Sequence, residues 1–150
     1  MTVRFVVLLA IALAGQTSAP QQKQAPSPLF SATHLSCSFP VYAAPVWKDG
    51  AAQVVSRAQD FTFDIDAINT KKNSAQIIGK GGGSAHASTV VTPIALNIIE
   101  ATPIGNLNVT TVFVAGSEDG KYMAVHSRHI GDLTSAPAPS QNYGTCTIAK

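Results

Sequence analysis

The sequence predicts an all-β protein, an antiparallel meander of seven or eight short strands that closes or partly closes into a small barrel or roll. Short runs of alternating apolar and polar residues recur along the chain, tight-turn residues separate them, and no segment has a strong helical period. Two cysteines near opposite ends of the predicted fold would also join its first and last strands, which favours closure and removes exposed edges. A two-sheet sandwich is the alternative.

The chain of 150 residues is expected to hold one domain behind two N-terminal segments. Residues 1–19 have the pattern of a secretory signal peptide, with a basic start at Arg4 and an apolar run too short to span a bilayer. Residues 20–33 are expected to be a disordered leader, and the β-domain is expected to cover residues 34–150. This organisation predicts a periplasmic or secreted protein without stable membrane insertion after signal cleavage.

The first strand is predicted at Leu35–Phe39, where apolar residues alternate with serine and Cys37 lies on the apolar face. Prolines and Gly50 interrupt the next stretch, Pro40–Gln59, which is expected to be a loop with one short element. Trp47, the only tryptophan, lies in this stretch. We expect its side chain to plug one end of the core; stacking against a ligand is the alternative.

Phe61–Asp66 is the clearest strand, because apolar residues alternate there with threonine and aspartate. A turn at Asn69–Ser74 and a return strand at Ala75–Ile78 complete a hairpin. The following Gly79–Ser84 is rich in glycine and contains Lys80, yet it lacks the spacing of a phosphate-binding P-loop. It is therefore interpreted as a flexible connection.

The most hydrophobic stretch, Ile94–Val114, is predicted to form a second hairpin around a two-residue turn at Gly105-Asn106. That turn would pair Ile104 with Leu107. Pro103 is compatible with this register, since its missing N–H would point away from the partner strand.

In this register, Glu100 lies opposite Thr111 and interrupts an otherwise apolar face. A lone buried carboxylate would cost several kcal/mol unless it were paired. Glu100 is therefore expected to have a partner if this face lines the core, and Arg128 on a nearby strand is the first candidate.

The remaining elements flank this hairpin. Ala85–Thr92 is predicted to be the strand before it, Ser117–Gly120 a tight turn after it, and Tyr122–Ile130 the next strand. Gly131–Asn142, which contains two prolines, is expected to be an irregular arm. It leads to Cys146 at the end of the fold.

Cys37 and Cys146 are predicted to form a disulfide, because an exported protein matures in an oxidising compartment. The bond would close a loop of about 110 residues, for which the chain-entropy model gives roughly 4–5 kcal/mol of stabilisation. A metal or redox pair is the alternative, but it would favour the close CxxC spacing that this chain lacks.

His126-Ser127-Arg128-His129 is the most functional-looking polar run. On a regular strand the two histidines would lie on opposite faces and could not share a metal ion. No nucleophile elbow surrounds Ser127, and two aspartates at positions 64 and 66 are explained by strand alternation. No catalytic residue, metal site or cofactor is therefore predicted. The candidate binding residues are His126, Arg128, Trp47 and Glu100, with Arg128 as a possible carboxylate or anion contact.

The charge distribution argues against nucleic-acid binding. Ten lysines and arginines face eight acidic residues, for a formal net charge of +2, and the basic residues are scattered along the chain. No basic stripe with interleaved aromatic residues is present.

Four stretches together resemble a group of small exported bacterial proteins with no assigned role. They are Phe61–Asp66, Ile78-Gly79, His126–His129 and Pro139–Cys146. The resemblance covers most of the mature chain, and it implies a bacterial envelope or secreted location without implying an activity.

These observations favour a non-catalytic binding module whose partner is an unknown small molecule or protein. The alternatives are a structural or surface protein, and a hydrolase that uses His126 and Arg128 with an acidic partner.

Overall fold

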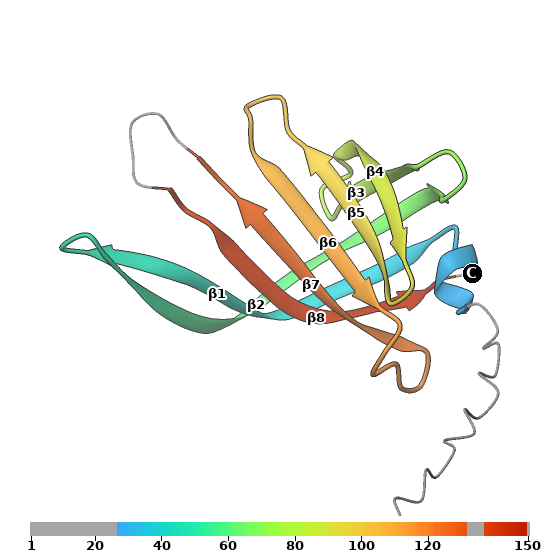
Figure 1. Cartoon of the computed structure of the whole chain (residues 1–150), viewed down its shortest axis with the longest axis horizontal. Coiled ribbons are helices and arrows are strands. Elements are labelled where there is room, and N and C mark those ends of the chain that lie inside the picture. The colour runs from blue at the N-terminus through green and yellow to red at the C-terminus, as the bar shows by residue number, and fades with distance from the viewer. Residues whose placement is uncertain (1–26, 132–136, 150) are drawn as a thin grey trace, which may run out of the picture.

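The computed structural model describes residues 27–131 and 137–149. Eight antiparallel strands follow one another as a meander, and the last strand pairs with the first to close a ring (Figure 1). The elements are a 3-10 helix η1 (Pro28–Ser31) and the strands β1 (Leu35–Lys48), β2 (Ala51–Asn69), β3 (Ser74–Gly79), β4 (Ser84–Thr92), β5 (Ala95–Ala101), β6 (Leu107–Phe113), β7 (Lys121–His129) and β8 (Ser140–Ile148). The predicted all-β meander is confirmed. The ring is not a regular barrel, because its strands vary from 6 to 19 residues in length.

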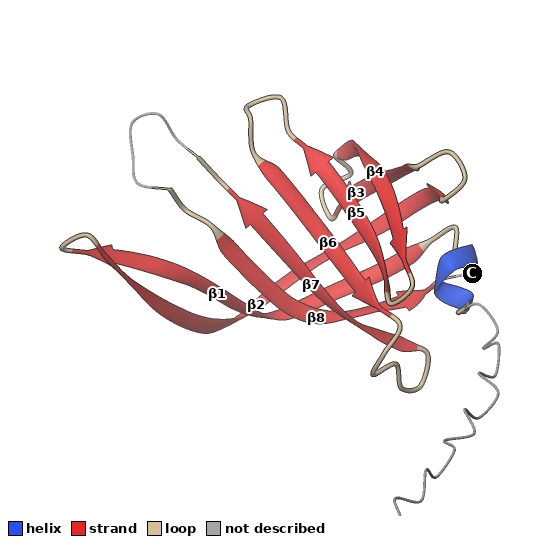
Figure 2. Ribbon diagram, viewed as in Figure 1, coloured by secondary structure: helices blue, strands red, loops and turns tan. Residues whose placement is uncertain are grey.

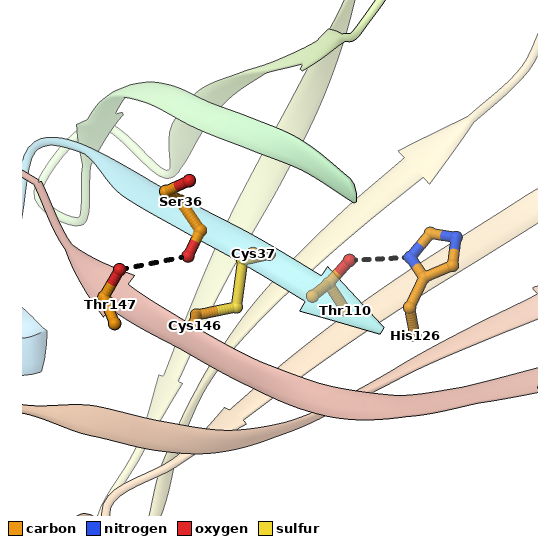
Figure 3. Close-up of a disulfide and its surroundings, with 6 residues drawn as sticks. All are labelled: Ser36, Cys37, Thr110, His126, Cys146 and Thr147. Atoms are coloured by element: carbon orange, nitrogen blue, oxygen red, sulfur yellow. Dashed lines mark hydrogen bonds between the residues drawn. A yellow bond between two sulfur atoms is a disulfide. The ribbon is translucent and has the colours of Figure 1, made fainter. Parts of the chain in front are cut away.

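The two ends of the meander are tied together at the predicted cysteine pair. Cys37 of β1 lies directly opposite Cys146 of β8, and the two sulfur atoms are bonded (Figure 3). The predicted disulfide is thus confirmed, and it crosses the seam at which the ring closes. No helix among the described residues is both long enough and apolar enough to cross a membrane.

One end of the ring is plugged by apolar side chains, and we call it the plugged end. The helix η1 lies at this end (Figure 2). Its Leu29 is fully buried and belongs to the same core cluster as Leu35 and Ile65. Residues 27–33 of the predicted disordered leader are therefore ordered, because Leu29 and Ala32 have apolar surface to bury against the strands. The signal-peptide prediction for residues 1–19 lies outside the described residues.

Strand alternation places the core as predicted for the first two strands. Leu35, Cys37 and Phe39 are buried while the residues between them are exposed, and Phe63 and Ile65 continue the pattern on β2. Side chains from the other strands complete the cluster. They include Ile68, Ala75, Leu96, Ile98, Val112, Tyr122 and Ala124.

Residues 40–59 were expected to be mainly a loop, and this prediction is wrong. β1 continues to Lys48 and β2 starts at Ala51, so the two strands form a long hairpin arm, residues 41–58, that extends beyond the ring (Figure 1). The prolines do not break it. In the register set by the two-residue turn, Pro45 occupies a non-hydrogen-bonded position toward β2, so no hydrogen bond to β2 needs its missing N–H. The pairing of β1 with β8 has already ended at Ala43, so none is lost on that side either.

The arm departs from the ring at a β-bulge. The register of β1 shifts between Phe39 and Val41 on its β2 side and between Ser38 and Val41 on its β8 side. At this point Gly144 of β8 approaches β1 so closely that a Cβ atom would lie 2.7 Å from the Cα of Phe39. Only glycine fits this position, and the bulge bends β1 out of the ring.

The predicted register of the β5–β6 hairpin is also wrong. Ala101, not Ile104, lies opposite Leu107, because the connection spans residues 102–106. Within it, the amide of Gly105 donates to the carbonyl oxygen of Thr102 over 3.0 Å, which puts Pro103 at the second position of a four-residue turn. Proline favours that position, and its preference outweighs a two-residue Gly-Asn turn.

Candidate functional site

The inward faces of β5 to β8 change from apolar to polar along the ring. The strand register aligns them in three successive rows. The rows are Leu96, Val112 and Ala124; then Ile98, Thr110, His126 and Asn142; then Glu100, Asn108, Arg128 and Ser140. The third row lies at the end opposite the plug, and we call it the open end.

A cleft of about 370 Å³ lies at the open end. Phe61, Phe63 and Ile77 line one side of it, and Glu100, Asn108, His126 and Arg128 line another. A volume of this size can hold a small molecule, and an apolar wall with a few convergent polar groups is typical of ligand sites. Three of the four candidate binding residues, His126, Arg128 and Glu100, therefore meet in one cleft.

His126 is held between aromatic rings at the inner end of the cleft. Its side chain is 4% exposed, and its ring centroid lies 5.1 to 5.8 Å from those of Phe39, Phe61 and Phe63. Its Nδ1 atom lies 2.9 Å from the hydroxyl oxygen of Thr110 (Figure 3). This packing fixes the orientation of the imidazole.

The environment of His126 also sets its protonation state. Burial, and secondly the nearby positive charge of Arg128, lower the pKa of His126 from 6.5 to about 4. The imidazole is therefore neutral at neutral pH, and it offers the cleft a hydrogen-bonding ring without a charge.

Glu100 and Asn108 are joined across neighbouring strands. The side-chain amide of Asn108 donates to the Glu100 carboxylate over 2.7 Å. The carbonyl oxygen of the Asn108 side chain is buried and has no hydrogen-bond partner among the described residues. The predicted pairing of Glu100 with Arg128 is wrong, because β6 lies between β5 and β7 and Asn108 takes the central position of the row.

A second polar network supports the cleft from β8. Gln59 of β2 donates both to the side-chain oxygen of Asn142, over 2.8 Å, and to the carbonyl oxygen of Phe39, over 3.1 Å. Asn142 in turn donates to the backbone carbonyl oxygen of His126 over 3.0 Å. These bonds satisfy a buried amide and connect four strands, β1, β2, β7 and β8, around the imidazole.

The sequence offered little signal for Gln59, Asn108 and Asn142. Gln59 and Asn142 lie in stretches that were expected to be loops, and Asn108 faces inward only in the corrected hairpin register. The alternation of Ser140, Asn142 and Cys146 on one face of β8 is the pattern that could have identified Asn142.

Trp47 does not join the other candidate residues. It lies on the arm, is 46% exposed, and its indole N–H donates to the carbonyl oxygen of Pro137 over 2.9 Å. The expected plug role is wrong for Trp47, because Leu29 fills the plugged end instead. A second cleft of about 300 Å³, lined partly by Ala43 and Pro45, lies where the arm meets β7 and β8, and Arg128 lines both clefts.

The cleft has little catalytic machinery in the described part of the chain. The hydroxyl of Thr110, rather than a carboxylate, contacts His126, and it is itself buried. Across residues 27–131 and 137–149, no group of three or more histidine, cysteine or acidic residues could hold a metal ion. The geometry can bind and orient a small molecule, whereas the hydroxyl–imidazole contact between Thr110 and His126 is buried away from solvent.

The chain matches no family model, no curated protein and no solved structure.

Proposed function

We propose that this protein is an exported, non-catalytic binding module that holds a small molecule in the cleft at the open end of its ring. One observation carries the proposal: His126, Arg128 and Glu100 come from separate positions in the sequence and converge opposite an aromatic wall. Polar groups gathered at the end of a ring are costly for folding, and a ligand that satisfies them supplies a reason for their presence.

The export part of the proposal is supported by the signal-like N-terminus and by the disulfide. A bond between Cys37 and Cys146 persists in an oxidising compartment such as the periplasm or the extracellular space. We infer that the mature domain works there.

Native mass spectrometry tests the proposal on protein purified from the envelope or medium of its own source. We expect a bound small molecule on the wild-type chain and its loss from Arg128→Gln. His129→Gln is the matched control, because His129 is the next residue of β7 and its exposed side chain points to the other face of the strand. A wild-type mass without an adduct, together with no thermal shift in a broad metabolite screen, would contradict the proposal.

A protein contact through the arm is a second candidate function. Val46 and Val54 are 51% and 76% exposed, and the edge of β2 away from β1 has no strand partner over residues 51–62 among the described residues. Exposed apolar side chains beside an open edge are typical of a protein-binding surface. Cross-linking in the source organism tests it, since Val54→Lys should remove the cross-linked species while Gln53→Lys should retain it.

A further inference from the structure

We infer that the cleft takes a small dipolar ligand: an anionic group against Arg128, a hydrogen-bond donor or cationic group against Glu100 and Asn108, and an apolar body against Phe61 and Phe63. This inference rests on the proposed function and names its ligand class.

Charged side chains lie both at the rim of the cleft and inside it. Asp60 and Lys80 at its rim pair with each other over 3.0 Å, and both side chains are largely exposed. His126 is neutral at neutral pH, since its pKa is lowered to about 4. Two opposite charges then remain within the cleft, on Glu100 and Arg128.

The two charged side chains inside the cleft lie apart from each other. Glu100 on β5 and Arg128 on β7 lie in the same row with Asn108 of β6 between them, so their Cα atoms are about 9–10 Å apart by strand spacing. No ion pair joins Glu100 and Arg128 among the described residues. A ligand with the reverse dipole would compensate both charges at once, whereas a simple anion or cation would compensate one.

The polar side chains of the cleft have hydrogen-bonding capacity that no described residue uses. Arg128 makes no hydrogen bond or ion pair with another described residue, and its guanidinium offers a planar fork suited to a carboxylate. The side-chain oxygen of Asn108 is buried without a partner in the described part of the chain, and one Glu100 oxygen accepts from the Asn108 amide. Both of these groups accept hydrogen bonds, so the ligand part that faces them must donate.

The other side of the cleft is an apolar wall. The rings of Phe61 and Phe63 lie 5.4 Å apart between centroids and line the cleft opposite the polar row. An aromatic or branched aliphatic substituent can pack there, while a ligand without an apolar body would leave this surface wet. Amino acids with large apolar side chains have all three parts in a size that fits about 370 Å³.

The test compares four probes that share one apolar body: L-phenylalanine, 3-phenylpropanoate, phenethylamine and 3-phenylpropanol. Binding is measured by calorimetry and by amide shifts in NMR spectra. We expect L-phenylalanine to bind at least about ten-fold more tightly than either singly charged probe, since each lost charge-assisted bond is worth about that factor.

Two variants should change the selectivity in opposite directions. Arg128→Gln should remove the preference for the carboxylate, so that phenethylamine binds as well as L-phenylalanine. Glu100→Gln should remove the preference for the ammonium, so that 3-phenylpropanoate binds as well as L-phenylalanine. A merely structural role would weaken all four probes alike, and His129→Gln should leave the wild-type order unchanged.

The outcomes separate the inference from the proposed function. If the neutral or singly charged probes bind as tightly as L-phenylalanine, or if the ligand released from native protein lacks an anion or a donor, the inference is overturned and the proposed function stands. If no probe binds and native protein carries no ligand, both the inference and the proposed function fail.

Discussion

The two ends of the ring are built from the same strands but from different chemistry. At the plugged end, Leu29, Leu35 and Ile65 are completely buried, and the disulfide fixes the seam. At the open end, Glu100, Asn108 and Arg128 share one row and line a cleft. The comparison indicates that stability is concentrated at one end and that the other end is free to carry a ligand site.

Loss of the disulfide should have the largest effect. The double variant Cys37→Ala, Cys146→Ala frees a loop with a sequence separation of 109, so the free energy of unfolding should fall by about 4–5 kcal/mol. Urea denaturation measures this loss, and reduction of the wild-type protein is the control. A decrease below about 1 kcal/mol would show that the seam is held by strand pairing alone.

Two substitutions on β5 compare the ends directly. Leu96→Ala removes a fully buried side chain from the core and should cost about 2–5 kcal/mol. Glu100→Ala, four residues further on the same inward face, should cost less than about 1 kcal/mol because Glu100 is only partly buried. Equal losses in urea denaturation would contradict the division between the ends.

His126 lies between the two ends and should make stability depend on pH. Its folded-state pKa of about 4 is below the unfolded value of 6.5, so the unfolded chain binds more protons between these values and stability falls as pH falls. The full loss from pH 7 to below pH 4 is roughly 3 kcal/mol. Subtracting the pH profile of His126→Gln from that of the wild type should isolate this slope, and His129→Gln should keep it. Parallel wild-type and His126→Gln profiles would disprove the depressed pKa.

The arm should contribute least to stability. Trp47 is half exposed and makes one hydrogen bond to Pro137, so Trp47→Ala should cost on the order of 1 kcal/mol or less. Fluorescence of this single tryptophan should be strongly quenched by acrylamide in the native state. Protection from acrylamide would mean that the arm is covered by a partner copy.

The sequence predicted the parts of the fold that depend on local pattern. Alternation identified the strand of Leu35 and Cys37 and the strand of Phe63 and Ile65, and the cysteine pair indicated closure. These features need no knowledge of which strand lies beside which, because period-two burial and cysteine chemistry act over short distances or through a covalent bond.

The parts that depend on register could not be predicted in this way. Pro103 selected a longer connection than Gly105-Asn106 suggested, and the resulting shift gave Glu100 a new neighbour, Asn108. Prolines in the arm were interpreted as breaks because their tolerance depends on where pairing with β8 ends. Alternation put His126 and Arg128 on one face, but only closure of the ring determines that this face is the interior.

The most direct test of the account is the free energy of unfolding of the double variant Glu100→Gln, Arg128→Gln in the absence of ligand. Glu100→Gln keeps the shape of its side chain and Arg128→Gln shortens it, and together the two changes remove both charges of the open end while each position keeps a polar amide. If this end is kept polar for a ligand, the variant should be as stable as the wild type or more stable, as is common when a binding site is neutralised. A loss of more than about 2 kcal/mol would show that the charges hold the fold together, and it would contradict the account.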